Sequence, residues 1–224
     1  MVVGHGRARG RSAALGIASW MTAELVGPRV RLRGLRAEDF PAWQVVRARS
    51  RDWLTPWEPR PAGAAHLPED RASFVSRCQM RERERQLGTG YGFGIFVRGE
   101  LAGEINLGAI QRGSFQNGYV GYWIDVDKAG NGYVPEACVL LFAFAFEELG
   151  LHRLQVAIVP RNTASRRVAR KLWLRGEGIA CRYLEINGRW EDHVRYAITA
   201  EEWVERRGRY REEWLGLAAG QAPR

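Results

Sequence analysis

The segment best suited to chemistry is a glycine loop that directly precedes an apolar helix. The loop is Gly130–Asn131–Gly132, and an almost wholly apolar run extends from Pro135 to Leu149. The first backbone N–H groups of a helix have no partner inside the helix, and glycines allow an anion to approach them closely. We therefore predict that the amides from Asn131 to Val134 bind a phosphate or pyrophosphate group, which the helix dipole favours by about 0.3–2 kcal/mol.

Two better-known phosphate loops do not match this segment. A Walker loop needs Lys and then Ser or Thr after its last glycine, but Tyr133 and Val134 follow Gly132. The dinucleotide-binding fingerprint needs a third small residue where Pro135 stands. Glycines before a helix are also common in ordinary turns, so the loop alone leaves a purely structural alternative open.

Side chains that could transfer protons occur in strand-like segments. Glu104 stands between Gly103 and Ile105, where a carboxylate must face a cleft, be paired, or point to solvent. Asp192 and His193 form a second candidate pair, although a His in a strand is more often packed and hydrogen-bonded than catalytic.

The first half of the chain predicts a strand, a helix, an irregular connection and a second helix. Apolar residues alternate with arginines from Val30 to Leu35, and the acidic start at Glu38 and Asp39 opens a helix. Prolines at 56, 59, 61 and 68 interrupt the chain, so the segment from Leu54 to Ala65 is irregular, and a helix follows from Pro68 to Gln86.

The second half predicts an antiparallel meander, then a crossover through the apolar helix, then a hairpin. The meander strands are Tyr91 to Val97, Leu101 to Ile110 and Tyr119 to Val126. After the helix from Pro135 to Leu149, we expect the following elements: a strand from Leu154 to Val159, a short helix from Asn162 to Leu172, a hairpin from Tyr183 to Ile198 turned at Asn187–Gly188, and a last helix capped by Thr199 and Glu202. The fold class is therefore α/β, of the α+β type, with a mainly antiparallel sheet.

The basic composition is compatible with an anionic partner but does not identify it. The 224 residues carry 34 Lys and Arg against 25 Asp and Glu, a net charge of +9, and Lys128 and Lys171 are the only lysines. The arginines are scattered, so we expect a dispersed solvated surface or, alternatively, a contact with RNA or the ribosome.

We expect one soluble, cytoplasmic domain from residue 23 to 205. Residues 1–22 are predicted to be a disordered or over-annotated leader, and residues 206–224 the end of the last helix and a loose tail. The three cysteines lie far apart without a CxxC pair, which predicts reduced thiols and no metal site. The richest apolar stretch, Ala137 to Phe146, is shorter than the roughly 20 residues that span a bilayer.

Two motifs in the correct order resemble the acetyl-CoA-binding core of the GNAT acetyltransferases. They are VGYWIDVDKAGNGYVPEA, from Val120 to Ala137, and HRLQVAIVPRNTASRRVARKLWLRGEG, from His152 to Gly178. The flanking pieces PWEP, RGSF and INGRWEDHV resemble more narrowly the RimJ-type ribosomal-protein alanine N-acetyltransferases. The resemblance covers most of the chain from Val26 to Trp203, and it implies a twisted, mixed, mainly antiparallel sheet of about seven strands flanked by helices.

The resemblance also implies which residues bind the cofactor, acetyl-CoA. Ile124, Asp125 and Val126 would offer backbone groups to the pantetheine arm, and Asn162 and Ser165 would face its thiol end. The pyrophosphate would be held by the loop residues Asn131, Gly132, Tyr133 and Val134.

In this family a neutral amine attacks the thioester directly, and a strand amide stabilises the oxyanion. Because an α-amine has a pKa near 8, a modest or water-mediated base suffices. RimL-type relatives have a Glu at the position of Tyr119 as their expected base, whereas a Tyr here suits an acid better. Glu104 is our preferred base, and Ser165 would protonate the leaving thiolate unless it serves only the start of its helix.

The expected acceptor is a protein N-terminus, in particular the N-terminal alanine of a ribosomal protein. Acceptor selection is assigned to the segments Trp53 to Arg60, Arg112 to Phe115 and Arg189–Trp190. Two alternatives remain: acetylation of a small amine such as an aminoglycoside or polyamine, and a non-catalytic CoA-binding ribosome-assembly factor. The sequence leaves open whether the protein is a monomer or a homodimer.

Overall fold

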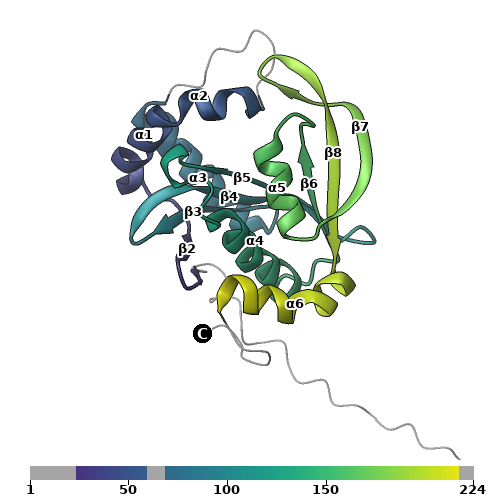
Figure 1. Ribbon diagram of the computed structural model, residues 1–224. Helices are drawn as coiled ribbons and strands as arrows, with labels where there is room; N and C mark the ends of the chain where they lie inside the picture. Colours follow the sequence, from purple (N-terminus) through teal and green to yellow (C-terminus); the bar gives the residue numbers. More distant parts are fainter. Residues whose placement is uncertain (1–23, 60–68, 217–224) are drawn as a thin grey trace, which may run out of the picture.

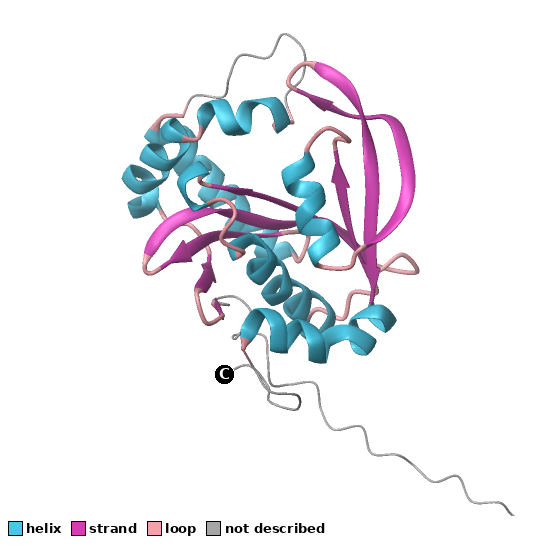
Figure 2. Cartoon of the chain, viewed as in Figure 1, coloured by secondary structure: helices cyan, strands magenta, loops and turns pink. Residues whose placement is uncertain are grey.

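The computed structural model describes residues 24–59 and 69–216. These residues form an eight-stranded sheet with the order β1-β2-β3-β4-β5-β6-β8-β7 and helices on both faces (Figures 1 and 2). All neighbouring strands are antiparallel except β5 and β6. The predicted leader, the expected helix start at Pro68 and the tail beyond Gly216 lie outside the described residues.

The mixed, mainly antiparallel sheet is confirmed, with one strand more than the expected seven. The strands are β1 (Leu25–Val26), β2 (Val30–Arg33), β3 (Tyr91–Val97), β4 (Glu100–Gln111), β5 (Asn117–Ile124), β6 (Arg153–Ile158), β7 (Arg175–Ile186) and β8 (Arg189–Thr199).

The helices lie close to their expected positions. The α-helices are α1 (Phe40–Arg49), α2 (Arg51–Leu54), α3 (Arg71–Leu87), α4 (Tyr133–Ala143), α5 (Thr163–Lys171) and α6 (Ala200–Leu215). Three 3-10 turns, η2 (Ala37–Asp39), η3 (Thr55–Trp57) and η4 (Val126–Lys128), connect these elements. The apolar helix expected as far as Leu149 changes after Ala143 into a π-helical turn, η5 (Phe144–Glu148).

The two faces of the sheet have separate cores, because successive side chains of a strand point in opposite directions. In β4, Ile105 belongs to the large core that includes α4, whereas Glu104 faces Trp43 of α1 and Arg77 of α3. Every residue of α4 from Val134 to Phe142 is buried, as its apolar sequence predicts.

The last helix covers the outer side of α4. Trp203 packs against Phe142 and Phe146, and its indole N–H donates to Glu147 at 2.9 Å. The predicted capping box at its start is confirmed by reciprocal bonds between Thr199 and Glu202. The helix continues past residue 205 and ends at Leu215, within the stretch where the end of the last helix is expected.

Candidate functional site

The sheet opens between its two parallel strands. β5 and β6 pair only at Asn117, Gly118 and Tyr119, although both strands continue beyond these residues. Figure 1 shows the strands diverging from that point, with α4 and α5 following them. Past Tyr119, each strand therefore presents one edge that pairs with no other strand among residues 24–59 and 69–216.

Backbone alternation decides which groups face this opening. The amide of Asp125 donates to Ala102 of β4 at 2.7 Å, so the N–H and C=O groups of Tyr122 and Ile124 point the other way, toward β6. Because these two amides face away from β4, and β6 pairs with β5 only as far as Tyr119, neither has a hydrogen-bond partner within the described part of the chain. Ile124, one of the expected pantetheine contacts, thus offers free backbone groups to the opening.

Asp125 and Val126, the other two expected pantetheine contacts, make hydrogen bonds within the protein itself. The Asp125 carboxylate is fully buried and accepts hydrogen bonds from Arg49, from Ser50 and from the amide of Asp127. The amide of Val126 donates to Ser50 Oγ at 3.1 Å. These two residues fix the turn that carries the chain from β5 into the glycine loop.

The glycine loop presents its amides as the sequence suggests. Gly130 and Gly132 both have φ of 81°, in the left-handed region that favours glycine. The Asn131 side chain turns back to the carbonyls of Lys128 and Ala129, each at 3.2 Å. Among the described residues, no acceptor is bonded to the amides from Asn131 to Val134, so these donors remain available at the α4 N-terminus.

An ion pair that supports the loop joins the half-exposed Arg29 to the buried Glu136, and no sequence pattern indicated it. Glu136, fully buried in the first turn of α4, accepts bonds from the amides of Arg29 and Val30 and from Arg29 Nε, at 2.8, 2.9 and 2.7 Å. The two residues lie 107 positions apart, and no local pattern connects them.

The opposite side of the opening is formed by α5. Asn162 is its N-cap and accepts from the amide of Ser165 at 3.0 Å, so the cap is Asn162 rather than Ser165. Tyr122 Oη, from β5, donates to the carbonyl of Ser165 at 3.4 Å. Asn162 and Ser165 therefore lie on α5, beside the opening.

Glu104 lies on the face of the sheet that α1 and α3 cover. Its Oε1 accepts from Trp43 Nε1 at 2.8 Å and from Arg77 at 3.2 Å. Glu104 pairs with Trp123, four residues along β5 from Tyr119, which is about 13 Å at the usual strand rise. The two candidate catalytic side chains therefore do not meet.

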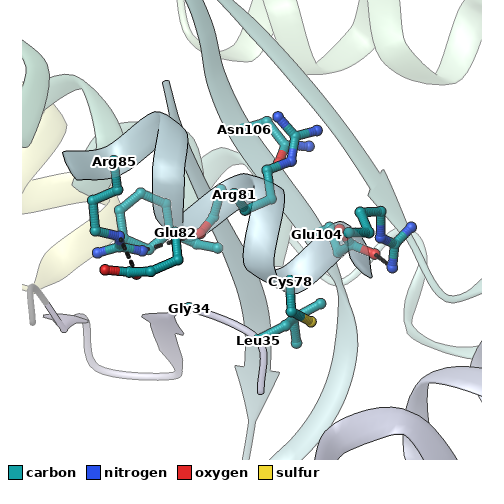
Figure 3. Close-up of a pocket in the computed structure, with 11 residues that line it drawn as sticks. Gly34, Leu35, Cys78, Arg81, Glu82, Arg85, Glu104 and Asn106 are labelled. Atoms are coloured by element: carbon teal, nitrogen blue, oxygen red, sulfur yellow. Dashed lines mark hydrogen bonds and ion pairs between the residues drawn. The ribbon is translucent and has the colours of Figure 1, made fainter. Parts of the chain in front are cut away.

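A small cavity next to Glu104 is not a cofactor site. It encloses about 50 Å³, whereas ligand pockets usually measure roughly 300–1,000 Å³. Figure 3 shows α3 side chains lining it opposite Glu104 and Asn106. Each of its arginines already faces a carboxylate; the pairs are Arg77–Glu104, Arg81–Glu84 and Arg85–Glu82.

Tyr119 lies where β5 and β6 separate and contacts Tyr183 of β7. Tyr183 hydrogen-bonds to Tyr119, and burial raises the pKa of Tyr183, with Tyr119 acting in the same direction. The Tyr183 ring meets His193 edge-on at 5.7 Å. His193 is only 2% exposed, and its Nδ1 lies 2.9 Å from the Glu191 carbonyl, which makes that nitrogen the donor.

The second candidate pair is not a pair in the structure. Asp192 and His193 are consecutive strand residues and point to opposite sides of the hairpin. Asp192 accepts from the amide of Arg182 at 2.8 Å and has no contact with the His193 ring.

Two of the three expected acceptor segments meet at the open end of the sheet. Pro59 forms a bridge to Ile186, and the Asn187 amide donates to Glu58 at 2.9 Å, which joins the α2 segment to the β7–β8 turn. Arg112 to Phe115 instead form the β4–β5 turn, at the end where β5 and β6 are still paired. This third segment therefore lies apart from the other two, and sequence alone does not show which turns share an end of the sheet.

Two negative findings concern the described residues only. Residues 24–59 and 69–216 contain no group of three or more His, Cys, Asp or Glu side chains arranged to hold a metal ion. Over the same ranges, no helix combines the length and apolar character needed to cross a membrane.

Known proteins share this arrangement. A model of the acetyltransferase (GNAT) domain matches residues 29–174. The probable N-acetyltransferase YjcK of Bacillus subtilis (strain 168) is 33% identical over 177 residues, covering 78% of this chain and 96% of that protein. The ribosomal protein uS5-alanine N-acetyltransferase of Escherichia coli (strain K12) is 31% identical over 186 residues, covering 79% and 94%.

A solved structure agrees with the sequence relatives. Mycobacterium smegmatis RimJ in complex with CoA-disulfide superposes with a TM-score of 0.73 at 31% identity, over 82% of this chain and 93% of that one. The RimJ resemblance inferred from the motifs is confirmed at the level of family and fold. The chain belongs to the GNAT acetyltransferase family.

Proposed function

We propose that this protein is a cytoplasmic enzyme that transfers the acetyl group of acetyl-CoA to a protein N-terminal amine, with the N-terminal alanine of a ribosomal protein as its acceptor. The observation that carries the proposal is the opened edge of β5 next to the unpaired amides of the α4 N-terminus. The similarity to a uS5-alanine N-acetyltransferase supports the choice of acceptor.

The residues present fit acetyl-CoA. The amides from Asn131 to Val134 would bind the pyrophosphate, because they have no other acceptor within the described residues and the helix dipole favours an anion there. The backbone groups of Tyr122 and Ile124 would pair with the amides of the pantetheine arm in the way that a neighbouring strand would. Bound there, acetyl-CoA supplies the activated acetyl thioester.

The groups beside the opening suit a reaction that needs little acid–base assistance. A useful fraction of an α-amine is neutral near pH 7, so orientation and a polar contact for the amine are the main requirements. We assign Tyr119, with its partner Tyr183, to the acceptor side, since it lies where β5 and β6 part. Ser165 on α5 is the donor assigned to the leaving thiolate.

Glu104 stays a candidate base, but its geometry favours a role in packing. The carboxylate is buried and accepts bonds from Trp43 and Arg77 on one oxygen. Because it faces the α1–α3 side, it would reach an amine at the opening only through water. Substitution by Gln separates the two roles, as described in the Discussion.

The charged side chains of the α2 segment and the β7–β8 hairpin, at the open end of the sheet, favour a polypeptide acceptor over a small polyamine. A polycation would require unpaired carboxylates, yet Glu58 is paired with Arg47 at 2.5 Å and Glu191 with Arg161 at 2.9 Å. Arg161 also lies over the Trp57 ring at 5.2 Å, which places charge and aromatic surface beside the α2 segment.

The proposal is tested with the purified protein, acetyl-CoA and a set of N-terminal peptides that differ in their first residue. Mass spectrometry should detect acetylation of the α-amine, fastest for peptides that begin with alanine. Acetylation of polyamines or aminoglycosides alone would replace the proposed acceptor. If acetyl-CoA binds but no amine is acetylated, the protein is a cofactor-binding module and not an acetyltransferase.

A further inference from the structure

The pyrophosphate loop is held by a side chain from a distant part of the chain. Arg29, in the turn between β1 and β2, donates through Nη1 to the Asn131 carbonyl at 3.1 Å and through Nη2 to the Gly132 carbonyl at 3.5 Å. The same guanidinium donates through Nε to Glu136 at 2.7 Å. One planar group thus connects the loop to the first turn of α4.

The hydrogen bonds from Arg29 to the loop carbonyls also affect the direction in which the loop amides point. In a peptide unit the C=O and the following N–H point in nearly opposite directions. When Arg29 holds the carbonyls of Asn131 and Gly132, it therefore orients the amides of Gly132 and Tyr133 away from itself. For Tyr133 the first bond of α4 acts in the same direction, since the Glu136 amide donates to the Gly132 carbonyl at 3.2 Å. The amides of Gly132 and Tyr133 are among those that the proposed function assigns to the pyrophosphate.

Several contacts restrain the guanidinium, although the Arg29 side chain is 45% exposed. Glu136 is fully buried and binds the backbone amide of Arg29 as well as its Nε. The guanidinium also lies 5.4 Å from the centre of the Tyr133 ring. A side chain restrained at its backbone, at Nε and over an aromatic ring loses little further freedom when a ligand binds.

The third support comes from α6. A Cβ built on Gly132 would lie 3.3 Å from the Trp214 ring and 3.4 Å from Arg29 Nη2. The loop is therefore enclosed by Arg29 on one side and by Trp214 on another. Gly132 is needed both for its φ of 81° and because a side chain would disturb these two neighbours.

We propose that Arg29, oriented by Glu136, is a positioning residue that fixes the loop amides for the pyrophosphate of CoA. This inference rests on the proposed function, because it assumes that CoA is the ligand of the loop. Arg29 acts through the Asn131 and Gly132 carbonyls, so its loss should affect ligands that carry the diphosphate and spare those that lack it.

The test compares CoA with pantetheine, which lacks the diphosphate. Calorimetry gives the Kd of CoA for the wild type, Arg29→Ala, Arg29→Lys and Glu136→Gln, and an NMR titration gives the Kd of pantetheine. We expect Arg29→Ala to weaken CoA about tenfold, equivalent to ~1.4 kcal/mol, and to leave pantetheine within about twofold. Arg29→Lys should be intermediate, since a lysine cannot reach the carboxylate and two carbonyls together.

Arg31→Ala is the matched control. Arg31 is an exposed arginine two residues away on β2 and pairs with Glu24 at 3.6 Å, so its removal changes the net charge equally. The inference is overturned if Arg29→Ala and Arg31→Ala weaken CoA alike, or if Arg29→Ala weakens both ligands equally. If Arg29→Ala does not fold, the affinities of Arg29→Lys and Glu136→Gln for CoA and for pantetheine are compared in the same way. A wild-type protein that does not bind CoA refutes the proposed function itself.

Discussion

The Tyr122 hydroxyl donates to the Ser165 carbonyl at 3.4 Å and so joins the two sides of the opened sheet. Tyr122 lies on β5 beyond the last residue that pairs with β6, and Ser165 lies in the first turn of α5. Burial raises the pKa of Tyr122, so the hydroxyl stays protonated and can only be the donor to the carbonyl. The bond places the start of α5 relative to the free edge of β5, where the proposed cofactor site lies.

Replacing Tyr122 by Phe should weaken CoA binding several-fold and lower the free energy of unfolding by the contribution of one hydrogen bond. One net hydrogen bond contributes roughly 0.5–1.5 kcal/mol, and the ring would keep its packing. Calorimetry and urea denaturation measure the two effects. Tyr91→Phe is the control, since Tyr91 is buried in β3 and packs edge-on against Phe144, away from the opened edge of β5. Equal CoA affinity in the two variants would show that the Tyr122 bond does not shape the site.

The two loop glycines should respond differently to alanine. Both have φ of 81°, but a Cβ on Gly130 would meet nothing within 4 Å, whereas one on Gly132 would crowd Trp214 and Arg29. Each substitution strains the backbone by about 1 kcal/mol, and Gly132→Ala should lose roughly 1 kcal/mol more. It should also weaken CoA to a greater extent. Denaturation curves and calorimetry of the pair check this, and a larger loss at Gly130 would contradict it.

Glu104→Gln separates packing from catalysis. Gln retains an acceptor for Trp43 but removes the charge opposite Arg77. We expect the free energy of unfolding to fall by about 1–2 kcal/mol and kcat to stay within about threefold. Steady-state kinetics with acetyl-CoA and a peptide that has a free N-terminal amine provide the second value. A loss of kcat of about 10²-fold or more at unchanged stability would instead identify Glu104 as the general base.

The cysteines should differ in reactivity. Burial raises the pKa of Cys138 and, to a lesser degree, of the half-buried Cys78, and both effects disfavour the reactive thiolate. Cys181 is exposed on β7. Brief treatment with iodoacetamide followed by peptide mass spectrometry should label Cys181 first and Cys138 only after denaturation. Early labelling of Cys138 in the native protein would mean that α4 is not the buried central helix.

Stability near the first helix should depend on pH through Asp39. Burial alone would raise its pKa, but hydrogen bonds from Arg33 and from the Arg36 amide more than offset this and lower it below the usual value. A lowered native pKa stabilises the fold at pH values above the unfolded pKa, about 3.9, and this contribution disappears as the pH falls through the native pKa.

Asp39→Asn should therefore destabilise the protein by about 1 kcal/mol at pH 7 and by less near pH 3. Urea denaturation at the two pH values tests this, with Asp52→Asn, at an exposed residue of α2, as the control. A difference that is the same at both pH values would exclude the ionised Asp39 as its source.

Local sequence patterns predicted most helices and strands, whereas part of β7 depends on contacts with residues distant in the chain. β3 has the predicted limits, the hairpin turns at Asn187 and Gly188, which both have positive φ, and the last helix begins at its capping box. The stretch from Arg175 to Arg182 was not predicted as a strand, because its glycines interrupt any alternation and only pairing with β8 makes it extended. The sequence thus predicted those helices, strands and turns that depend on residues close together in the chain.

The site was predictable to the same extent. The glycine loop and the end of β5 follow from sequence, since both depend on residues close together in the chain. The Arg29–Glu136 pair and the contact between the α2 segment and the β7–β8 turn join residues more than 100 positions apart. Single-sequence reasoning contains no information on such distances.

The most direct test of the account is an NMR titration of the ¹⁵N-labelled protein with CoA. We predict that the largest amide shifts occur at Tyr122 and Ile124 on the edge of β5 and from Asn131 to Val134 at the start of α4. Shifts confined to the α3 cavity around Gly92 and Asn106, or no shifts with CoA at millimolar concentration, would contradict the placement of the cofactor between β5 and β6.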